Sequence, residues 1–346
     1  MNDFAQNVDA TRVTAVTPSA RFTQLKASNY DLSNTCNLTC EGCLYFARSS
    51  SGPAHDGIDA EWEALFAAEA ARGINFAYIA GAEPALQPAR LQSAWRHIKT
   101  GVIFTNGTRK IDPDIGFRIH VSLWGIGETA KELRGADVNT KAFRNFGTDP
   151  RAVFVFTINS QNIDEIVPVA ALAAKHGAIL TYSYHSPTDQ YLDQSSAAHF
   201  TASDYLTMLS AGTDIRHTPE TFAKARKQIA TAMQLYPDTV KYSMHYNDWI
   251  TQPSKDLWEL DENGIAINCG NRNSPDHRHY GADATLQSGK CCLPNLNCGE
   301  CRPYAPGFGS YLSRREEFLG TREDRRGYVE GLRLWKSLFL PLETAE

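Results

Sequence analysis

Three cysteines that lie close together in the sequence have the clearest chemistry in this chain. Cys36, Cys40 and Cys43 follow a C-x₃-C-x₂-C spacing. Three thiolates on so short a loop are close enough to bind three irons of a cubane cluster. Because iron–sulfur clusters usually take four cysteines, a loop with three leaves one iron open. We therefore expect a cluster whose fourth iron binds an exchangeable group.

Two other uses of these cysteines depend on their spacing and on the start of the chain. A zinc site would need a further ligand such as a distant histidine, and zinc sites usually present paired C-x₂-C units. Disulfides are typical of small secreted chains, whereas this chain opens without a basic segment followed by an apolar core. The sequence holds no apolar run of the ~18 residues needed to cross a membrane. We expect a soluble, cytoplasmic protein with no membrane partner, whose cysteines bind metal.

The composition is that of a globular protein. The 346 residues are 42% hydrophobic and 21% charged, and the formal net charge is −5 at pH 7. This length is enough for one large domain and a smaller one, each with its own core. Nucleic-acid-binding proteins normally carry a basic patch or stripe, so we expect no nucleic-acid partner.

Strand-like and helix-like stretches alternate between residues 22 and 187. Several strand candidates are almost continuously apolar or β-branched, which is typical of strands buried on both faces. The alternation predicts βαβ units and a parallel sheet. Six strands are too few for an eight-stranded barrel, so the predicted fold is α/β, a partial TIM-like (β/α)6 barrel. The expected strands are Gln24–Tyr30, Asn75–Ala80, Val102–Thr105, Arg118–Trp124, Ala152–Asn159 and Ile179–Tyr184.

Helix signals and turns divide the chain further. Asp59 is the expected cap of the first helix, and Asn263-Gly264 predicts a hairpin turn. The run His277-Arg278-His279 is expected on an exposed hairpin without a role. The expected helices cover Ala60–Arg72, Ile163–His176 and 219–236, with a last helix that carries Leu332, Leu334, Trp335 and Leu338. The predicted units are a tail (1–20), the partial barrel (21–200), a helical bridge or substrate-facing insert (201–260) and a small cysteine-rich module with a C-terminal helix (261–346).

The cysteine loop resembles the cluster loop of the radical S-adenosylmethionine enzymes. In that family a 4Fe–4S cluster binds the amino and carboxylate groups of S-adenosyl-L-methionine at its open iron. The resemblance covers roughly residues 24–185. It implies that Cys36, Cys40 and Cys43 hold such a cluster with the cofactor beside it. Parallel α/β folds bind ligands at the carboxyl ends of their strands, and the loop follows the first strand.

Further segments resemble the family at successive strand ends. Gly81, Ala82 and Glu83 resemble its GGEP motif, whose backbone receives the amino group of the cofactor, although Ala82 replaces the second glycine and restricts φ. Gly42 stands where the family often has an aromatic residue beside the adenine, a contact that Leu44, Tyr45 or Phe46 takes over. Arg134 resembles the arginine that pairs with the cofactor carboxylate. The resemblance implies other polar cofactor contacts from Asn106, Ser122 and Asn159.

A second group of five cysteines lies near the end of the chain. Four thiolates close a coordination shell, which suits an iron–sulfur cluster or structural zinc. The order of these cysteines resembles the Twitch module, the shortened form of the SPASM extension, and implies an auxiliary 4Fe–4S cluster. One thiol is left over from the adjacent pair, either as a buried apolar side chain or as a catalytic hydrogen-atom donor. The five are Cys269, Cys291, Cys292, Cys298 and Cys301.

The resemblance implies an oxidoreductase that reductively cleaves S-adenosylmethionine and abstracts a hydrogen from its substrate. It needs an external one-electron reductant such as flavodoxin or ferredoxin. Because about twenty residues precede the first strand, we expect no leader-peptide-binding domain and hence a small-molecule substrate: an aminosugar, aminocyclitol or amino-acid derivative. Late polar and aromatic residues suit a polar ring: Tyr182, Tyr184, His185, Asp189, His245, Tyr246, Asn247 and Asp248.

Two alternatives stay open. One is radical modification of a peptide or protein, by epimerisation or crosslinking, with the spare thiol of Cys291 or Cys292 as the hydrogen donor. The other is a non-catalytic iron–sulfur electron carrier. A carrier has no reason to combine an open three-cysteine site with the further motifs at the strand ends.

Overall fold

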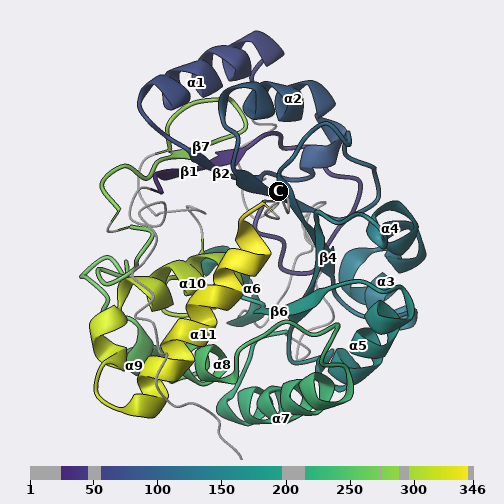
Figure 1. Ribbon diagram of the computed structural model, residues 1–346, viewed down its shortest axis with the longest axis vertical. Coiled ribbons are helices and arrows are strands. Elements are labelled where there is room, and N and C mark those ends of the chain that lie inside the picture. Colours follow the sequence, from purple (N-terminus) through teal and green to yellow (C-terminus); the bar gives the residue numbers. More distant parts are fainter. Residues whose placement is uncertain (1–24, 46–55, 197–214, 273, 288–295, 342–346) are drawn as a thin grey trace, which may run out of the picture.

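One parallel sheet organises the structure (Figure 1), which is a computed structural model that describes residues 25–45, 56–196, 215–272, 274–287 and 296–341. The strand order is β6-β5-β4-β3-β2-β1-β7. All six expected strands are present within a few residues of their predicted bounds. The strands are β1 (Ala27–Asp31), β2 (Phe76–Ala80), β3 (Gly101–Thr105), β4 (Arg118–Leu123), β5 (Ala152–Ile158), β6 (Leu180–Tyr184) and β7 (His279–Tyr280).

The seventh strand corrects the prediction of an exposed hairpin at 277–279. β7 pairs in parallel with β1, with Asn29 opposite His279 and Tyr30 opposite Tyr280. The ring of Tyr280 stacks on that of Tyr30, with centroids 5.7 Å apart, and its hydroxyl donates to Glu69 over 2.8 Å. The side chain of His279 is only 3% exposed. His279 is buried, while Arg278 stays exposed, because β1 offers a free sheet edge, which local sequence does not reveal.

Helices cover the outer face of the sheet and its open side (Figure 1). The expected helices are confirmed, but the cap of the first is Ile58, whose backbone N–H donates to Glu61, and Asp59 is the first helical residue. No described helix is long and apolar enough to span a bilayer. The helices are α1 (Asp59–Ala71), α2 (Pro88–His97), α3 (Glu128–Arg134), α4 (Asn139–Phe146), α5 (Ile166–Lys175), α6 (Asp189–Ser196), α7 (Pro219–Leu235), α8 (Met244–Ile250), α9 (Ser254–Leu257), α10 (Tyr304–Ser313) and α11 (Arg322–Phe339), with short 3₁₀ turns at Pro84–Leu86, Ile163–Glu165 and Arg315–Phe318.

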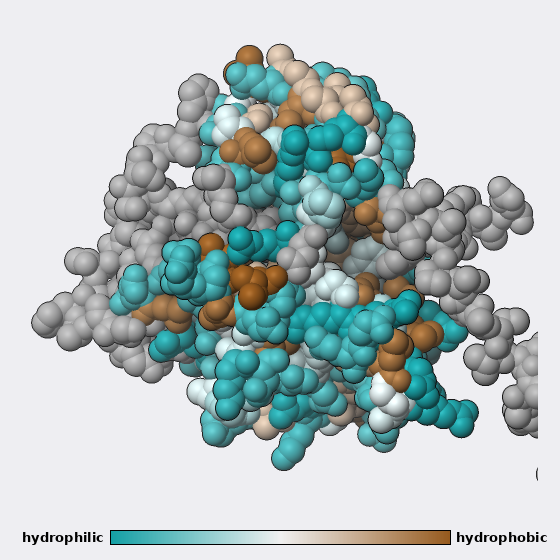
Figure 2. Space-filling model, turned by 90° about the vertical axis from the view of Figure 1, so that its left-hand side faces the viewer, coloured by the Kyte–Doolittle hydropathy of each residue, from teal (hydrophilic) through white to brown (hydrophobic). Residues whose placement is uncertain are grey.

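The end of α11 packs against side chains of the central strands. The ring of Phe339 meets the rings of Tyr78 on β2 and His120 on β4. Arg118 and His120 both donate to the backbone carbonyl of Leu338, over 3.2 and 2.8 Å. The C-terminal helix therefore belongs to the same core as the strands. The face of the molecule in Figure 2 is mostly hydrophilic, with apolar residues in small separate groups.

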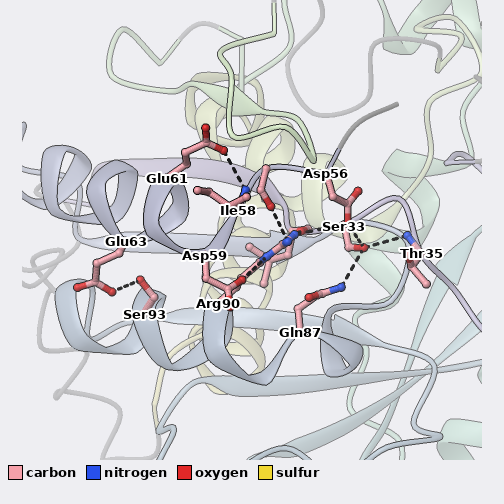
Figure 3. Close-up of polar contacts among 12 residues, drawn as sticks. Ser33, Thr35, Asp56, Ile58, Asp59, Glu61, Glu63, Gln87, Arg90 and Ser93 are labelled. Atoms are coloured by element: carbon pink, nitrogen blue, oxygen red, sulfur yellow. Dashed lines mark hydrogen bonds and ion pairs between the residues drawn. The ribbon is translucent and has the colours of Figure 1, made fainter. Parts of the chain in front are cut away.

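Arg90 on α2 joins α1 and α2 to the start of the cysteine loop (Figure 3). Its guanidinium donates to the backbone carbonyls of Leu32 and Gly57 and to the carboxylate of Asp59, the last over 3.0 Å. Nearby, the hydroxyl of Ser33 donates to Asp56 over 2.7 Å and accepts the backbone N–H of Thr35 and the amide of Gln87. These contacts set the path of residues 32–35 before the first cysteine.

Arg90→Met should destabilise the fold. The carbonyls of Leu32 and Gly57 would lose their guanidinium donor, and each buried carbonyl left without a partner costs ~1–3 kcal/mol. We expect the free energy of unfolding, measured by urea titration, to fall by about 2–4 kcal/mol. Arg96→Met is the matched control, because Arg96 pairs with Glu63 at the surface and should change stability little. Equal losses in the two variants would contradict this role.

A candidate cofactor site at the carboxyl ends of the strands

A cavity of about 310 Å³ lies inside the sheet at the carboxyl ends of the strands. Cys36, Cys40 and Cys43 all line it, and each is partly exposed. No group of three metal-binding side chains among the described residues is close enough to hold a single metal ion. Thiols that bind three different irons of a cubane need not converge on one point. The loop thus presents three thiols to one cavity.

The cysteine loop is fastened to the end of α3. The backbone N–H groups of Thr39 and Glu41 donate to the carbonyls of Arg134 and Leu133, over 3.3 and 2.8 Å. Gly42 has φ +58°, and a Cβ there would lie 2.9 Å from Nε2 of His185. The ring of His185 therefore takes the space that a side chain at position 42 would need, which favours glycine there.

The segment after β2 carries a buried carboxylate that joins two strand ends. Glu83 is 1% exposed, and burial raises the pKa of its carboxyl. Its Oε1 accepts the backbone N–H of Ala85 and the hydroxyl of Thr105, and its Oε2 accepts the backbone N–H of Asn106. Gly81 has φ +89°, and a Cβ there would lie 2.4 Å from the backbone of Asp31. The residues predicted to bind cofactor here, 81–83, all line the cavity.

Arg134 brings a buried cation to the cavity. Its side chain is 2% exposed, one Nη donates to the carbonyl of Ser122 over 2.7 Å, and its Nε has no hydrogen-bond partner. No salt bridge joins it to a carboxylate among the described residues. Ser122 also lines the cavity, and its hydroxyl accepts the indole N–H of Trp124. The charge of Arg134 opposes the rise in the pKa of Glu83, and its Nε–H has no protein acceptor in the part of the chain that the structure describes, so this buried guanidinium is suited to bind a ligand carboxylate.

Tyr45 lines the cavity beside the loop and is tied to β1. Its hydroxyl donates to Oδ1 of Asp31 over 3.2 Å, and burial raises the pKa of the phenol, so it stays protonated. The other oxygen of Asp31 lies 2.9 Å from Nε2 of His279. This Asp31–His279 pair joins β1 to β7 at the edge of the site. Nothing in the local sequence around residue 279 indicated it.

The structure separates the two asparagines expected at the site. Asn106 lines the cavity, and its amide lies 3.8 Å from Sγ of Cys36. Asn159 is fully buried but is not among the lining residues, and its side-chain oxygen accepts the backbone N–H of Gln161. On the same strand, Thr157 faces the cavity instead.

Several lining residues were not expected from the sequence, and two of them contact each other. His120 on β4 and Tyr304 on α10 hydrogen-bond to one another, and burial lowers the pKa of His120 to about 3. The imidazole is therefore neutral, with Nδ1 accepting the phenol proton. The alternating pattern of β4 places residues 118, 120 and 122 on one face, which is the signal that could have found His120. Of the polar residues expected to meet substrate, Tyr184 and His185 line the cavity and the other six do not.

The second cysteine group is described in part. Cys291 and Cys292 lie outside the described residues. Cys269 and Cys301 are buried in the main core and Cys298 packs against it. The backbone N–H of Cys301 donates to the carbonyl of Cys298, which gives the C-x₂-C pair a tight turn, and the hydroxyl of Ser310 lies 3.6 Å from Sγ of Cys269.

Comparison with known proteins shows the fold. No family model matches the chain, and no curated protein matches it in sequence. SuiB from Streptococcus suis bound to S-adenosylmethionine is 12% identical, with a TM-score of 0.51 over 76% of this chain and 59% of SuiB. The anSMEcpe structure with bound AdoMet is 14% identical, with a TM-score of 0.50 over 90% of this chain and 87% of that one. SuiB bound to precursor peptide SuiA is 11% identical, with a TM-score of 0.51 over 80% of this chain and 63% of SuiB.

These matches confirm the expected fold, which is that of the radical S-adenosylmethionine enzymes. The chain spans less than two thirds of the length of SuiB. The residues at the cavity fit the group that this fold implies. The fit rests on three thiols, a buried guanidinium on Arg134 whose Nε has no hydrogen-bond partner, and a glycine turn at Gly81 that brings backbone to the cavity.

Glu83→Gln should destabilise the protein, because each carboxylate oxygen of Glu83 accepts a backbone N–H. The NH₂ group of glutamine would face one of these donors in either orientation. Leaving a buried donor unsatisfied costs ~1–3 kcal/mol, which is the expected loss in the free energy of unfolding by urea titration. Glu132→Gln, on the exposed face of α3, is the control and should be silent. Wild-type stability of Glu83→Gln would remove this carboxylate from its proposed structural role.

Proposed function

We propose that this chain is a radical S-adenosylmethionine enzyme. The observation that carries the proposal is that Cys36, Cys40, Cys43 and the buried Arg134, whose Nε has no hydrogen-bond partner, line one cavity at the strand ends. When bound, a reduced 4Fe–4S cluster supplies the electron that cleaves S-adenosylmethionine to methionine and a radical able to take a hydrogen atom from an unactivated carbon. The protein's part is to bind, orient and exclude water.

Each side chain at the cavity has a role in this proposal. Arg134 binds the cofactor carboxylate through its guanidinium, and the backbone of Gly81 and Ala82 faces the amino group. Ser122 offers a hydroxyl to the cofactor, and Tyr45, held by Asp31, forms a wall for the adenine. The aromatic side chains that line the cavity exclude water from the reacting atoms. We assign Asn159 only to shaping the end of β5.

The second cysteine group is proposed to bind an auxiliary 4Fe–4S cluster. Cys269, Cys298 and Cys301 supply three ligands, and one of Cys291 and Cys292 supplies the fourth. The remaining thiol is the proposed catalytic hydrogen donor. The reaction also needs an external one-electron reductant such as flavodoxin or ferredoxin. These assignments follow the order of the cysteines and the burial of Cys269 and Cys301 in one core.

For the substrate we favour a peptide or protein over the small polar molecule. The support is that one structure with this fold is SuiB bound to precursor peptide SuiA. Deuterium transfer separates the two classes. The enzyme is incubated with either a fully deuterated peptide fraction or a fully deuterated metabolite fraction, and the 5′-deoxyadenosine formed is analysed by mass spectrometry. Deuterium from the peptide fraction alone supports the proposal, and deuterium from the metabolite fraction alone returns the substrate to the small-molecule class.

The Cys36, Cys40 and Cys43 triple Ala variant should lose one cluster and all cofactor cleavage. Anaerobically reconstituted wild-type protein should hold about eight irons per chain and the variant about four, since each cubane carries four. Formation of 5′-deoxyadenosine with dithionite should fall to the background of protein-free reactions. Unchanged formation in the variant would end the radical proposal, whereas no formation by the wild type would favour the electron carrier.

Arg134→Lys should weaken cofactor binding with both clusters intact. Lysine keeps the charge but loses the planar fork that binds a carboxylate through two bonds. One lost charge-assisted hydrogen bond costs ~1.5–3 kcal/mol, or roughly a ten- to hundredfold rise in the dissociation constant. Titration of S-adenosylmethionine, followed by the spectrum of the reduced cluster, measures it. Arg144→Lys, on the exposed face of α4, is the matched control. If Arg134→Lys bound S-adenosylmethionine as tightly as the wild type does, Arg134 would not be part of the cofactor site.

A further inference from the structure

A closed ring of hydrogen bonds between side chains joins the cysteine loop to the end of β3. The amide of Asn37, the residue after Cys36, donates to the hydroxyl of Thr108 over 2.9 Å. That hydroxyl donates to Oδ1 of Asn106 over 2.6 Å. The amide of Asn106 donates to Oδ1 of Asn37 over 2.9 Å and so closes the ring. Each member donates once and accepts once in the same direction.

The ring determines which way the amide of Asn106 points. Its oxygen accepts both the hydroxyl and the backbone N–H of Thr108, the latter over 2.9 Å. Two donors at the oxygen require the NH₂ group to lie on the opposite side. One of its two hydrogens goes to Asn37, and the second faces Sγ of Cys36 at an N···S distance of 3.8 Å. The orientation of the Asn106 amide is therefore fixed by the donors and acceptors around it.

Asn106 is itself held from the backbone. Its N–H donates to the buried carboxylate of Glu83 over 2.7 Å, and its side chain is buried with that of Thr108. Asn37 lies on the exposed side of the ring. An amide held at both ends keeps its N–H aimed at the sulfur without reorganising when charge is added there.

We propose that Asn106 is a positioning residue, which donates an N–H to the Cys36 thiolate and thereby raises the reduction potential of the first cluster. The inference rests on the proposed function and deepens it. Hydrogen bonds to ligand sulfurs are among the factors that set iron–sulfur potentials, because they stabilise the extra negative charge of the reduced state. The ring of hydrogen bonds with Asn37 and Thr108 orients this N–H toward the sulfur. It also gives Asn106 a role different from direct contact with the cofactor.

The test measures the midpoint potential of the first cluster by a redox titration followed by electron paramagnetic resonance. Asn106→Ala removes the donor and should make the potential more negative, with affinity for S-adenosylmethionine changed less than threefold. Thr108→Val removes the ring hydroxyl with almost no change of shape, and should shift the potential in the same direction but less. Thr108→Ser keeps the hydroxyl and should restore the wild-type potential.

Asn145→Ala is the matched control. The amide of Asn145 donates to the carbonyl of Gly107 over 2.9 Å, so it supports the same turn without approaching a cysteine. The midpoint potential of the first cluster in Asn145→Ala should equal that in the wild type. If Asn106→Ala fails to hold the cluster, Thr108→Val decides the question alone.

Two results would overturn the inference. The first is an unchanged potential in Asn106→Ala with the cluster loaded. The second is a loss of cofactor affinity at unchanged potential, which would make Asn106 a direct cofactor ligand. Neither result would contradict the proposed function. That function would be contradicted instead if S-adenosylmethionine did not change the spectrum of the wild-type cluster.

Discussion

The candidate site depends on one buried carboxylate. Glu83 follows β2, yet its two oxygens hold the backbone of the next turn and the end of β3, and its own N–H donates to the carbonyl of Thr35 just before the first cysteine. Three segments far apart in sequence meet at this side chain. Its burial is tolerated because three hydrogen-bond donors reach its oxygens and the positive charge of Arg134 acts on it, as buried charge requires. The cysteine loop therefore rests on a rigid support.

Arg134 serves the same site from the other side. Its carbonyl accepts the N–H of Thr39 in the cysteine loop, while its guanidinium reaches the cavity. A loop held only by its own hydrogen bonds would not keep three thiols in place, because each ordered residue loses conformational entropy. Fastening to β2, β3 and α3 offsets that loss. The position of the thiols and the position of the cation are thus coupled through one helix end.

The C-terminal part of the chain completes the site in addition to carrying the second cysteine group. It adds β7 to the sheet edge, where His279 meets Asp31, and it places Tyr304 against His120 inside the cavity. Cys269 and Cys301 lie in the same hydrophobic core as the strands. The two cysteine groups are therefore parts of one packed structure.

Local sequence alone determined the cysteine spacing, the six strands and most helix bounds, because thiol spacing and apolar runs are properties of neighbouring residues. The resemblance to the radical S-adenosylmethionine enzymes indicated Arg134 and the turn at Gly81. Only tertiary structure decided that His279 lies buried on a seventh strand, that Asn106 rather than Asn159 reaches the cavity, and that His185 takes the space beside Gly42. Those outcomes depend on which sheet edge is free and which side chains meet across distant segments. Such contacts have no signature in the residues on either side of them.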